Sequence, residues 1–209
     1  MAGVGGVMIV LPALPVRNPN IGMVYNGVHF SAEECDRIVA SVNQNAWQAG
    51  GVGGYGLTGT GSVQGDARRC TEQRLPVDQQ SGWPLSKIMF EACNINSQGW
   101  RFELDGFVND DMPYVMRYQA TNNDHIDWHM DMGQAQNSSR KLGFSIQLSE
   151  SSDYVGGDLE FHNVTLDSSA LRQRGTLALF PAYWLHRVTP VTHGERLVTV
   201  GWVHGPSYR

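Results

Sequence analysis

Two histidine–aspartate pairs lie close together near the middle of the chain. His125 precedes Asp127 by two positions, and His129 precedes Asp131 by the same interval. Residues two apart in an extended strand point to the same side, so either pair could offer an imidazole and a carboxylate to one ion. These donor types at this spacing indicate a site for a divalent transition metal, provided that a neighbouring strand supplies a third ligand.

His186, about fifty-five residues further on, could be that third ligand. Two imidazoles and one carboxylate on one face of an octahedral ion form the facial triad of non-haem Fe(II) oxygenases, which leaves three positions open for co-substrate and O2. A single His-x-Asp pair is a weak signal, because most such pairs are surface hydrogen-bonding groups. The order of other residues strengthens it: Tyr118 comes before the pairs, and Gly156-Gly157-Asp158-Leu159, Phe180-Pro181 and Arg196 come after them.

With this order of residues, the sequence resembles the Fe(II)/2-oxoglutarate dioxygenases and, within them, the prolyl-4-hydroxylase-like group. The resemblance covers roughly Tyr114 to Gly205. Its specific parts are the block Trp128-His129-Met130-Asp131, the segment GGDLEF and the stretch LFPAYWLHRVTPVTHGERLVTVGW. It implies a double-stranded β-helix, that is, a jelly-roll barrel whose open end holds the iron.

The resemblance makes His129, Asp131 and His186 the iron ligands. His125 and Asp127 remain an alternative pair, because they would put the same chemistry on the same strand face four residues earlier. The Trp-His-x-Asp pattern and its interval from the preceding tyrosine favour the later pair. Relatives that transfer chloride lack the carboxylate ligand, so the retained Asp131 implies hydroxylation or a related oxidation.

Three further residues match positions that bind the co-substrate in relatives. Arg196 matches the basic residue that pairs with the distal carboxylate of 2-oxoglutarate, and a planar guanidinium suits that bidentate contact. Tyr118 matches a tyrosine that hydrogen-bonds the co-substrate. Gln147 occupies a position where relatives place a polar side chain that faces the co-substrate.

The sequence departs from the family pattern two residues after this arginine. Relatives often have a serine there that donates a second hydrogen bond to the carboxylate, whereas this chain has Val198. Either another hydroxyl, such as that of Thr176 or Thr199, takes over this contact, or the co-substrate binds somewhat more weakly.

The resemblance implies a 2-oxoglutarate-dependent hydroxylase that uses Fe(II) and O2, with ascorbate as a further reductant. It would hydroxylate an unactivated C–H bond of an amino-acid-like group, prolyl or other, free or within a peptide or protein, and release succinate and CO2. One alternative is oxidation of a biosynthetic small molecule, and another is a non-catalytic module that binds metal or 2-oxoglutarate. The glycine-rich segment 50–66 precedes the barrel, where relatives have a mobile loop, and we expect it to act as a lid.

The elements that position these residues follow from local patterns. Ser31 and Glu34 form a capping box before a helix with apolar residues at helical spacing, and a second helix begins near Trp83-Pro84 and ends around 96–99. After Arg101, short segments alternate in the manner of strands: RFELDGF, PYVMRYQ, GFSIQLS, DLEFHNV, TLALF and RLVTVGWVH. We therefore expect one α+β, mainly β domain over 1–209, with helical and loop support in 1–100 and the jelly-roll core in 101–209.

Composition restricts the partners. The net charge is −5, from 15 basic and 20 acidic residues, and no Lys/Arg run occurs, so we expect neither a nucleic-acid nor a membrane partner. The substrate would be a small molecule, a peptide or a protein, and the sequence does not predict the oligomeric state. Three unpaired cysteines, Cys35, Cys70 and Cys93, favour a cytoplasmic location. We expect the apolar stretch Met1 to Val16 to be a buried or draped strand rather than a signal peptide.

Overall fold

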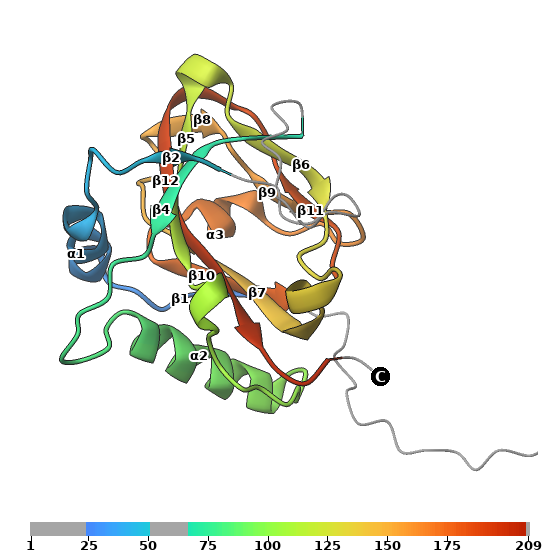
Figure 1. Cartoon of the computed structure of the whole chain (residues 1–209). Helices are drawn as coiled ribbons and strands as arrows, with labels where there is room; N and C mark the ends of the chain where they lie inside the picture. The colour runs from blue at the N-terminus through green and yellow to red at the C-terminus, as the bar shows by residue number, and fades with distance from the viewer. Residues whose placement is uncertain (1–23, 51–66, 208–209) are drawn as a thin grey trace, which may run out of the picture.

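The computed structural model describes residues 24–50 and 67–207 of the chain (Figure 1). The helices are α1 (Ala32–Ser41), α2 (Leu85–Gln98) and α3 (Ser168–Arg172), with short 3-10 helices η1 (Asn109–Asp111), η2 (Ala120–Asn122) and η3 (Ala135–Ser139). The strands are β1 (Tyr25–Val28), β2 (Gln48–Ala49), β3 (Arg68–Arg69), β4 (Thr71–Arg74), β5 (Tyr114–Gln119), β6 (His125–His129), β7 (Arg140–Gln147), β8 (Tyr154–Gly156), β9 (Leu159–Phe161), β10 (Thr176–Pro181), β11 (His186–Val188) and β12 (Val191–His204).

The strands form two antiparallel sheets. The larger sheet has the order β1-β10-β7-β12-β5-β4-β2, with β8 paired to β12, and the smaller has the order β3-β6-β11-β9. Two such sheets make up a jelly roll, so the predicted mainly β fold is confirmed. Apolar residues of α1 and α2, such as Ile38 and Ile88, share one core with Ile146 and Leu177 of the larger sheet. The helices α1 and α2 therefore cover the outside of that sheet (Figure 1).

Both long helices begin close to the predicted positions. In α1, the Ser31 hydroxyl accepts a hydrogen bond from the Glu34 N–H at 3.2 Å, and the Glu34 carboxylate accepts one from the Ser31 N–H at 2.9 Å. This is the predicted capping box. In α2, Pro84 is the residue before the helix rather than its first residue, and Gly99 follows its end.

Residues 1–100, for which we predicted helical and loop support, also contribute short strands to the sheets. The strands β1 to β4 lie in this half, and β1, β3 and β4 pair with β10, β6 and β5 of the barrel. They are two to four residues long, so tertiary pairing determines them rather than a pattern visible in the sequence. The segment RFELDGF was wrongly predicted as a strand, since its only β-type pairing is an isolated bridge between Gly106 and His204.

The remaining predicted strands correspond to β5, β7, β9, β10 and β12. The three-residue strand β8 and the five-residue helix α3 were not predicted, and β11 was expected only as a neighbouring strand that carries His186. The predicted N-terminal strand and residues 51–66 of the predicted lid lie outside the described residues. Within 24–50 and 67–207, none of the helices has the length and hydrophobicity that crossing a membrane requires.

Candidate metal centre

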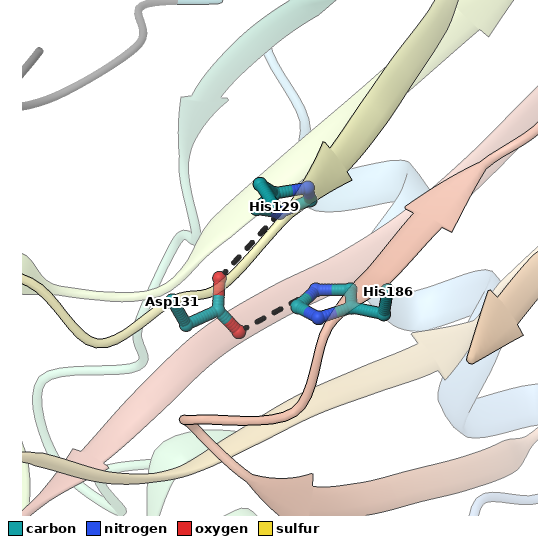
Figure 2. A group of neighbouring side chains, drawn as sticks. All are labelled: His129, Asp131 and His186. Carbon is teal, nitrogen blue, oxygen red and sulfur yellow. Dashed lines mark ion pairs between the residues drawn. The ribbon is translucent and has the colours of Figure 1, made fainter. Parts of the chain in front are cut away.

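Strand pairing brings the two favoured histidines together. His129 is the last residue of β6, His186 is the first residue of β11, and the two are direct partners in the antiparallel register. Their ring centroids lie 4.3 Å apart. Asp131 follows β6 by two residues, and one ligand atom from each of these side chains lies within 4.8 Å of the other two (Figure 2). The three residues could therefore hold one metal ion.

The backbone orients both imidazoles toward Asp131. Nδ1 of His129 lies 2.8 Å from the Asp127 carbonyl oxygen, and Nδ1 of His186 lies 2.8 Å from the Trp184 carbonyl oxygen. Because a carbonyl only accepts, we assign the proton of each neutral ring to Nδ1, which leaves the Nε2 lone pair for a metal. The two Nε2 atoms lie 3.7 and 3.6 Å from the two Asp131 carboxylate oxygens. Two imidazole nitrogens and a carboxylate suit Fe(II).

The alternative pair lies in a different environment. The His125 Nδ1 is 2.9 Å from the Asn123 carbonyl oxygen. Asp127 is exposed, and its carboxylate accepts a hydrogen bond from the Trp128 N–H at 2.8 Å. The group of potential metal ligands found among the described residues consists of His129, Asp131 and His186. The geometry therefore favours the later pair.

Burial keeps His129 neutral. Burial, reinforced by the neighbouring His186, lowers the pKa of His129 from its ordinary value to about 4. At neutral pH this imidazole therefore has its lone pair available for a metal without first losing a proton.

The same shift couples folding of the metal-free protein to pH. In the unfolded chain, His129 becomes protonated below its ordinary pKa of about 6.5. In the folded protein, it becomes protonated only below about pH 4. The free energy of unfolding should therefore fall between pH 6.5 and 4, by up to about 3 kcal/mol. Urea unfolding across this range measures it. His129→Gln should reduce the slope and His193→Gln, at an exposed site, should not; equal slopes in both variants would contradict this assignment.

Gly143 on β7 makes room for the carboxylate. A Cβ at this position would lie 2.6 Å from Asp131 Oδ2 and 2.7 Å from the Phe180 ring. We expect Gly143→Ala to displace the carboxylate and to weaken metal binding about 10- to 100-fold, the range for losing support of a ligand. Calorimetric titration with Mn(II) measures this effect. Gly133→Ala is the control, because a Cβ at position 133 would lie 3.4 Å from the nearest atom, Asn137 Cβ, which is an ordinary contact distance. Native metal affinity in Gly143→Ala would contradict this prediction.

A polar pocket adjoins the barrel interior around Arg196. Arg196 is 4% exposed, and Gln147 and Ser145 from the adjoining strand β7 and Thr176 from β10, the next strand along the sheet, also line the pocket. The Arg196 Nε donates to the Gln147 side-chain oxygen at 3.1 Å, and the Gln147 amide donates to the Ser149 carbonyl. The Arg196 Nη1 is buried and has no hydrogen-bond partner among the residues that the structure describes. A buried cation with an unused donor fits a carboxylate ligand.

The structure places Tyr118 next to Arg196, its register partner on β5. The Arg196 guanidinium lies 5.7 Å from the centre of the Tyr118 ring, whose hydroxyl donates to the Met116 sulfur at 3.4 Å. Burial raises the pKa of the Tyr118 hydroxyl, so it stays protonated. Tyr118 is not among the residues that line the pocket, and its predicted contact with the co-substrate stays a prediction.

The two threonines considered as substitutes for serine at 198 differ in position. Thr176 lines the pocket, although its hydroxyl donates to the Ala170 carbonyl at 3.0 Å. Thr199 is fully buried and, by strand alternation, points to the opposite face from Arg196. Ser145 was missed by the sequence analysis. Alternation along β7 from the named Gln147 could have found it, because residues two apart share a face.

Comparison with known proteins agrees with this geometry. Residues 114–204 match the model of the 2OG-Fe(II) oxygenase superfamily. A PKHD-type hydroxylase of Idiomarina loihiensis is 33% identical over 99 residues, which are 46% of this chain and 44% of the relative. One of Hyphomonas neptunium is 45% identical over 62 residues, 30% of this chain and 28% of the relative. The matches thus span less than half the length of these relatives.

Solved structures show the same fold at low identity. A Pseudomonas putida prolyl-4-hydroxylase has a TM-score of 0.62 and 17% identity, over 88% of this chain and 92% of that one. A viral collagen prolyl hydroxylase from Paramecium Bursaria Chlorella virus-1 has a TM-score of 0.60 and 15% identity, over 88% and 96%.

The jelly roll carries a histidine–aspartate–histidine cluster of the kind that non-haem Fe(II) oxygenases use to hold their iron. Residues 114–204 match the model of the 2OG-Fe(II) oxygenase superfamily, and the chain shares its fold with solved prolyl hydroxylases.

Proposed function

We propose that the protein is an Fe(II)- and 2-oxoglutarate-dependent dioxygenase. It hydroxylates an unactivated C–H bond of an amino-acid-like group, free or within a peptide or protein, and releases succinate and CO2. The observation that carries the proposal is the combination of a converging His129, Asp131 and His186 with a buried, unpartnered guanidinium nitrogen of Arg196 in one barrel. A site that binds only a metal has no need of the second feature.

Different side chains of this barrel would bind the metal and the co-substrate. His129, Asp131 and His186 would hold Fe(II), which when bound with 2-oxoglutarate activates O2 for attack on a C–H bond. Arg196 pairs with the distal carboxylate of 2-oxoglutarate, and Gln147 fixes the guanidinium through its Nε.

The substrate class rests on the relatives. The curated relatives are PKHD-type hydroxylases, and the solved structures of similar fold include prolyl hydroxylases, which favours an amino-acid residue as the acceptor. A biosynthetic small molecule is the second candidate, because pocket lining and loops set selectivity in such a barrel. The net charge of −5 disfavours a nucleic-acid substrate. We propose a cytoplasmic location, because three free cysteines are typical of a reducing compartment.

A turnover assay tests the proposal. The protein is supplied with Fe(II), ascorbate, O2 and 2-oxoglutarate, and succinate is measured with a panel of proline-containing peptides, other peptides and free amino acids. We expect succinate to rise above the substrate-free level together with a product that has gained one oxygen. A protein that binds both Fe(II) and 2-oxoglutarate but makes no succinate under any condition would instead be a non-catalytic binding module.

A further inference from the structure

The carboxylate ligand Asp131 lies outside β6, the strand that carries the ligand His129. β6 ends at His129, and Asp131 lies in the bend that follows. Its place therefore depends on its own backbone contacts rather than on the sheet. The Asp131 N–H donates to the Ala182 carbonyl at 3.0 Å, and the Asp131 carbonyl accepts a hydrogen bond from Arg140 Nη1 at 3.0 Å.

Arg140 is itself firmly placed. Its Nε and Nη2 donate to the two carboxylate oxygens of Asp111, each at 2.7 Å, in a bidentate pair. Its guanidinium stacks over the Trp202 ring, 3.4 Å from the ring centre. Because the guanidinium is planar, these contacts fix the direction in which the remaining nitrogen, Nη1, points.

Asp111 is anchored in turn by the last part of the barrel. The His204 Nε2 lies 3.0 Å from Asp111 Oδ2, and the His204 Nδ1 lies 2.8 Å from the Ser139 hydroxyl. Burial by itself raises the pKa of the Asp111 carboxyl, but its contacts with His204 and Arg140 outweigh burial and lower that pKa overall. The Asp111 side chain is thus a charged, fixed partner for Arg140.

We propose that Arg140, held by Asp111, is a positioning residue for the metal ligand Asp131. It acts through the Asp131 backbone carbonyl, and it keeps the carboxylate at the point where the Nε2 atoms of His129 and His186 converge. The inference rests on the proposed role of Asp131 as an iron ligand. The Arg140 guanidinium bonds the Asp111 carboxylate and the Asp131 backbone carbonyl and stacks on Trp202, so its effect is on geometry and affinity, not on chemistry.

The chemistry of arginine explains why this residue type is needed. One side chain must bind a carboxylate with two nitrogens and a carbonyl with a third, which a lysine ammonium cannot do in one fixed plane. Without the Nη1 contact, the bend after β6 keeps backbone contacts alone: the N–H groups of Asp131 and Met132 donate to the Ala182 carbonyl at 3.0 and 2.9 Å, and no side chain then holds the Asp131 carbonyl. Loss of comparable support for a metal ligand lowers metal affinity about 10- to 100-fold.

The test is an anaerobic titration of the full chain with Co(II), followed by calorimetry and by its visible ligand-field spectrum. We expect Arg140→Met, Arg140→Lys and Asp111→Asn each to weaken Co(II) binding about 10- to 100-fold and to alter the spectrum. The double variant Asp111→Asn/Arg140→Met should be no worse than the worse single one, because the two residues act as a unit.

The matched control is Arg174→Met. Arg174 likewise bonds a carboxylate, that of Asp36 at 2.6 Å, and a backbone carbonyl, that of Leu148 at 2.7 Å. It should lower thermal stability without changing the Co(II) affinity or spectrum. Native affinity and spectrum in a folded Arg140→Met would overturn the inference. If that variant does not fold, Arg140→Lys, which keeps the charge, decides the question in the same way. A wild-type chain that binds no Co(II) would overturn the ligand assignment itself.

Discussion

Asp131→Asn should abolish metal-dependent turnover without destabilising the metal-free fold. The Asp131 carboxylate is 8% exposed, and its nearest ionisable partners are two imidazole nitrogens at 3.6 and 3.7 Å, beyond hydrogen-bond distance. Without metal, the fold thus buries an anion that is poorly compensated, and such a charge costs stability. An amide of the same shape removes this cost and also removes the anionic ligand.

We therefore expect Asp131→Asn to lose metal affinity by more than about a hundredfold, the upper range for removing only a supporting residue. The melting temperature of its metal-free form should equal or exceed that of the wild type. Calorimetric metal titration and thermal unfolding in the presence of a chelator measure the two quantities. Asp127→Asn, on an exposed carboxylate two residues past His125, is the control and should leave metal affinity unchanged. Native metal affinity in Asp131→Asn would contradict the ligand role.

Arg196→Met should abolish tight 2-oxoglutarate binding and leave metal binding intact. The guanidinium is 4% exposed, with one buried nitrogen free of partners. A carboxylate that pairs with it there is shielded from water, and truncating one partner of such a pair costs about 2–5 kcal/mol. This range corresponds to a loss of affinity for 2-oxoglutarate of about 30- to several thousand-fold.

We expect Arg196→Met to lower the thermal stability of the protein much less than it lowers the affinity for 2-oxoglutarate. Methionine fills much of the same volume and removes a buried charge, and Nη1 of that guanidinium bonds no group in the described part of the chain. Equilibrium binding of 2-oxoglutarate and of Mn(II), together with thermal unfolding, measures these effects. Arg187→Met is the matched control, because Arg187 is adjacent to His186 in sequence but pairs with the partly exposed Glu160 at 2.7 Å. Equal losses of 2-oxoglutarate binding in both variants would argue against a specific role for Arg196.

The sequence predicted those features that depend on residue type at fixed spacing. The capping box before α1 and the Trp83-Pro84 signal before α2 are local, so both helices could be placed within one or two residues. The His-x-Asp pairs, His186 and Arg196 are single chemical groups in a recognisable order. They could be named without knowing the strand register that brings His129 beside His186.

Features that depend on tertiary pairing were not predictable in this way. The strands β2, β3 and β4 are too short for an alternation of polar and apolar residues to be visible. The segment RFELDGF does show this alternation, but it forms one isolated bridge, between Gly106 and His204, instead of a strand. We predicted that His129 and Asp131 share one face of a strand because they are two residues apart. In the structure, Asp131 instead lies in the bend after β6. What holds it there, through Arg140 and the space left by Gly143, comes from β7 and cannot be inferred from the spacing of the pair.

The most direct test of the account is an anaerobic titration of the metal-free protein with Fe(II) and 2-oxoglutarate, recorded as the weak visible charge-transfer band of the chelate. We predict a band in the wild type and in His125→Ala, and none in His129→Ala. Arg196→Ala should need far more 2-oxoglutarate to reach the same band. A folded, metal-binding wild type without the band would contradict the oxygenase function. A band lost in His125→Ala but kept in His129→Ala would place the ligand pair four residues earlier.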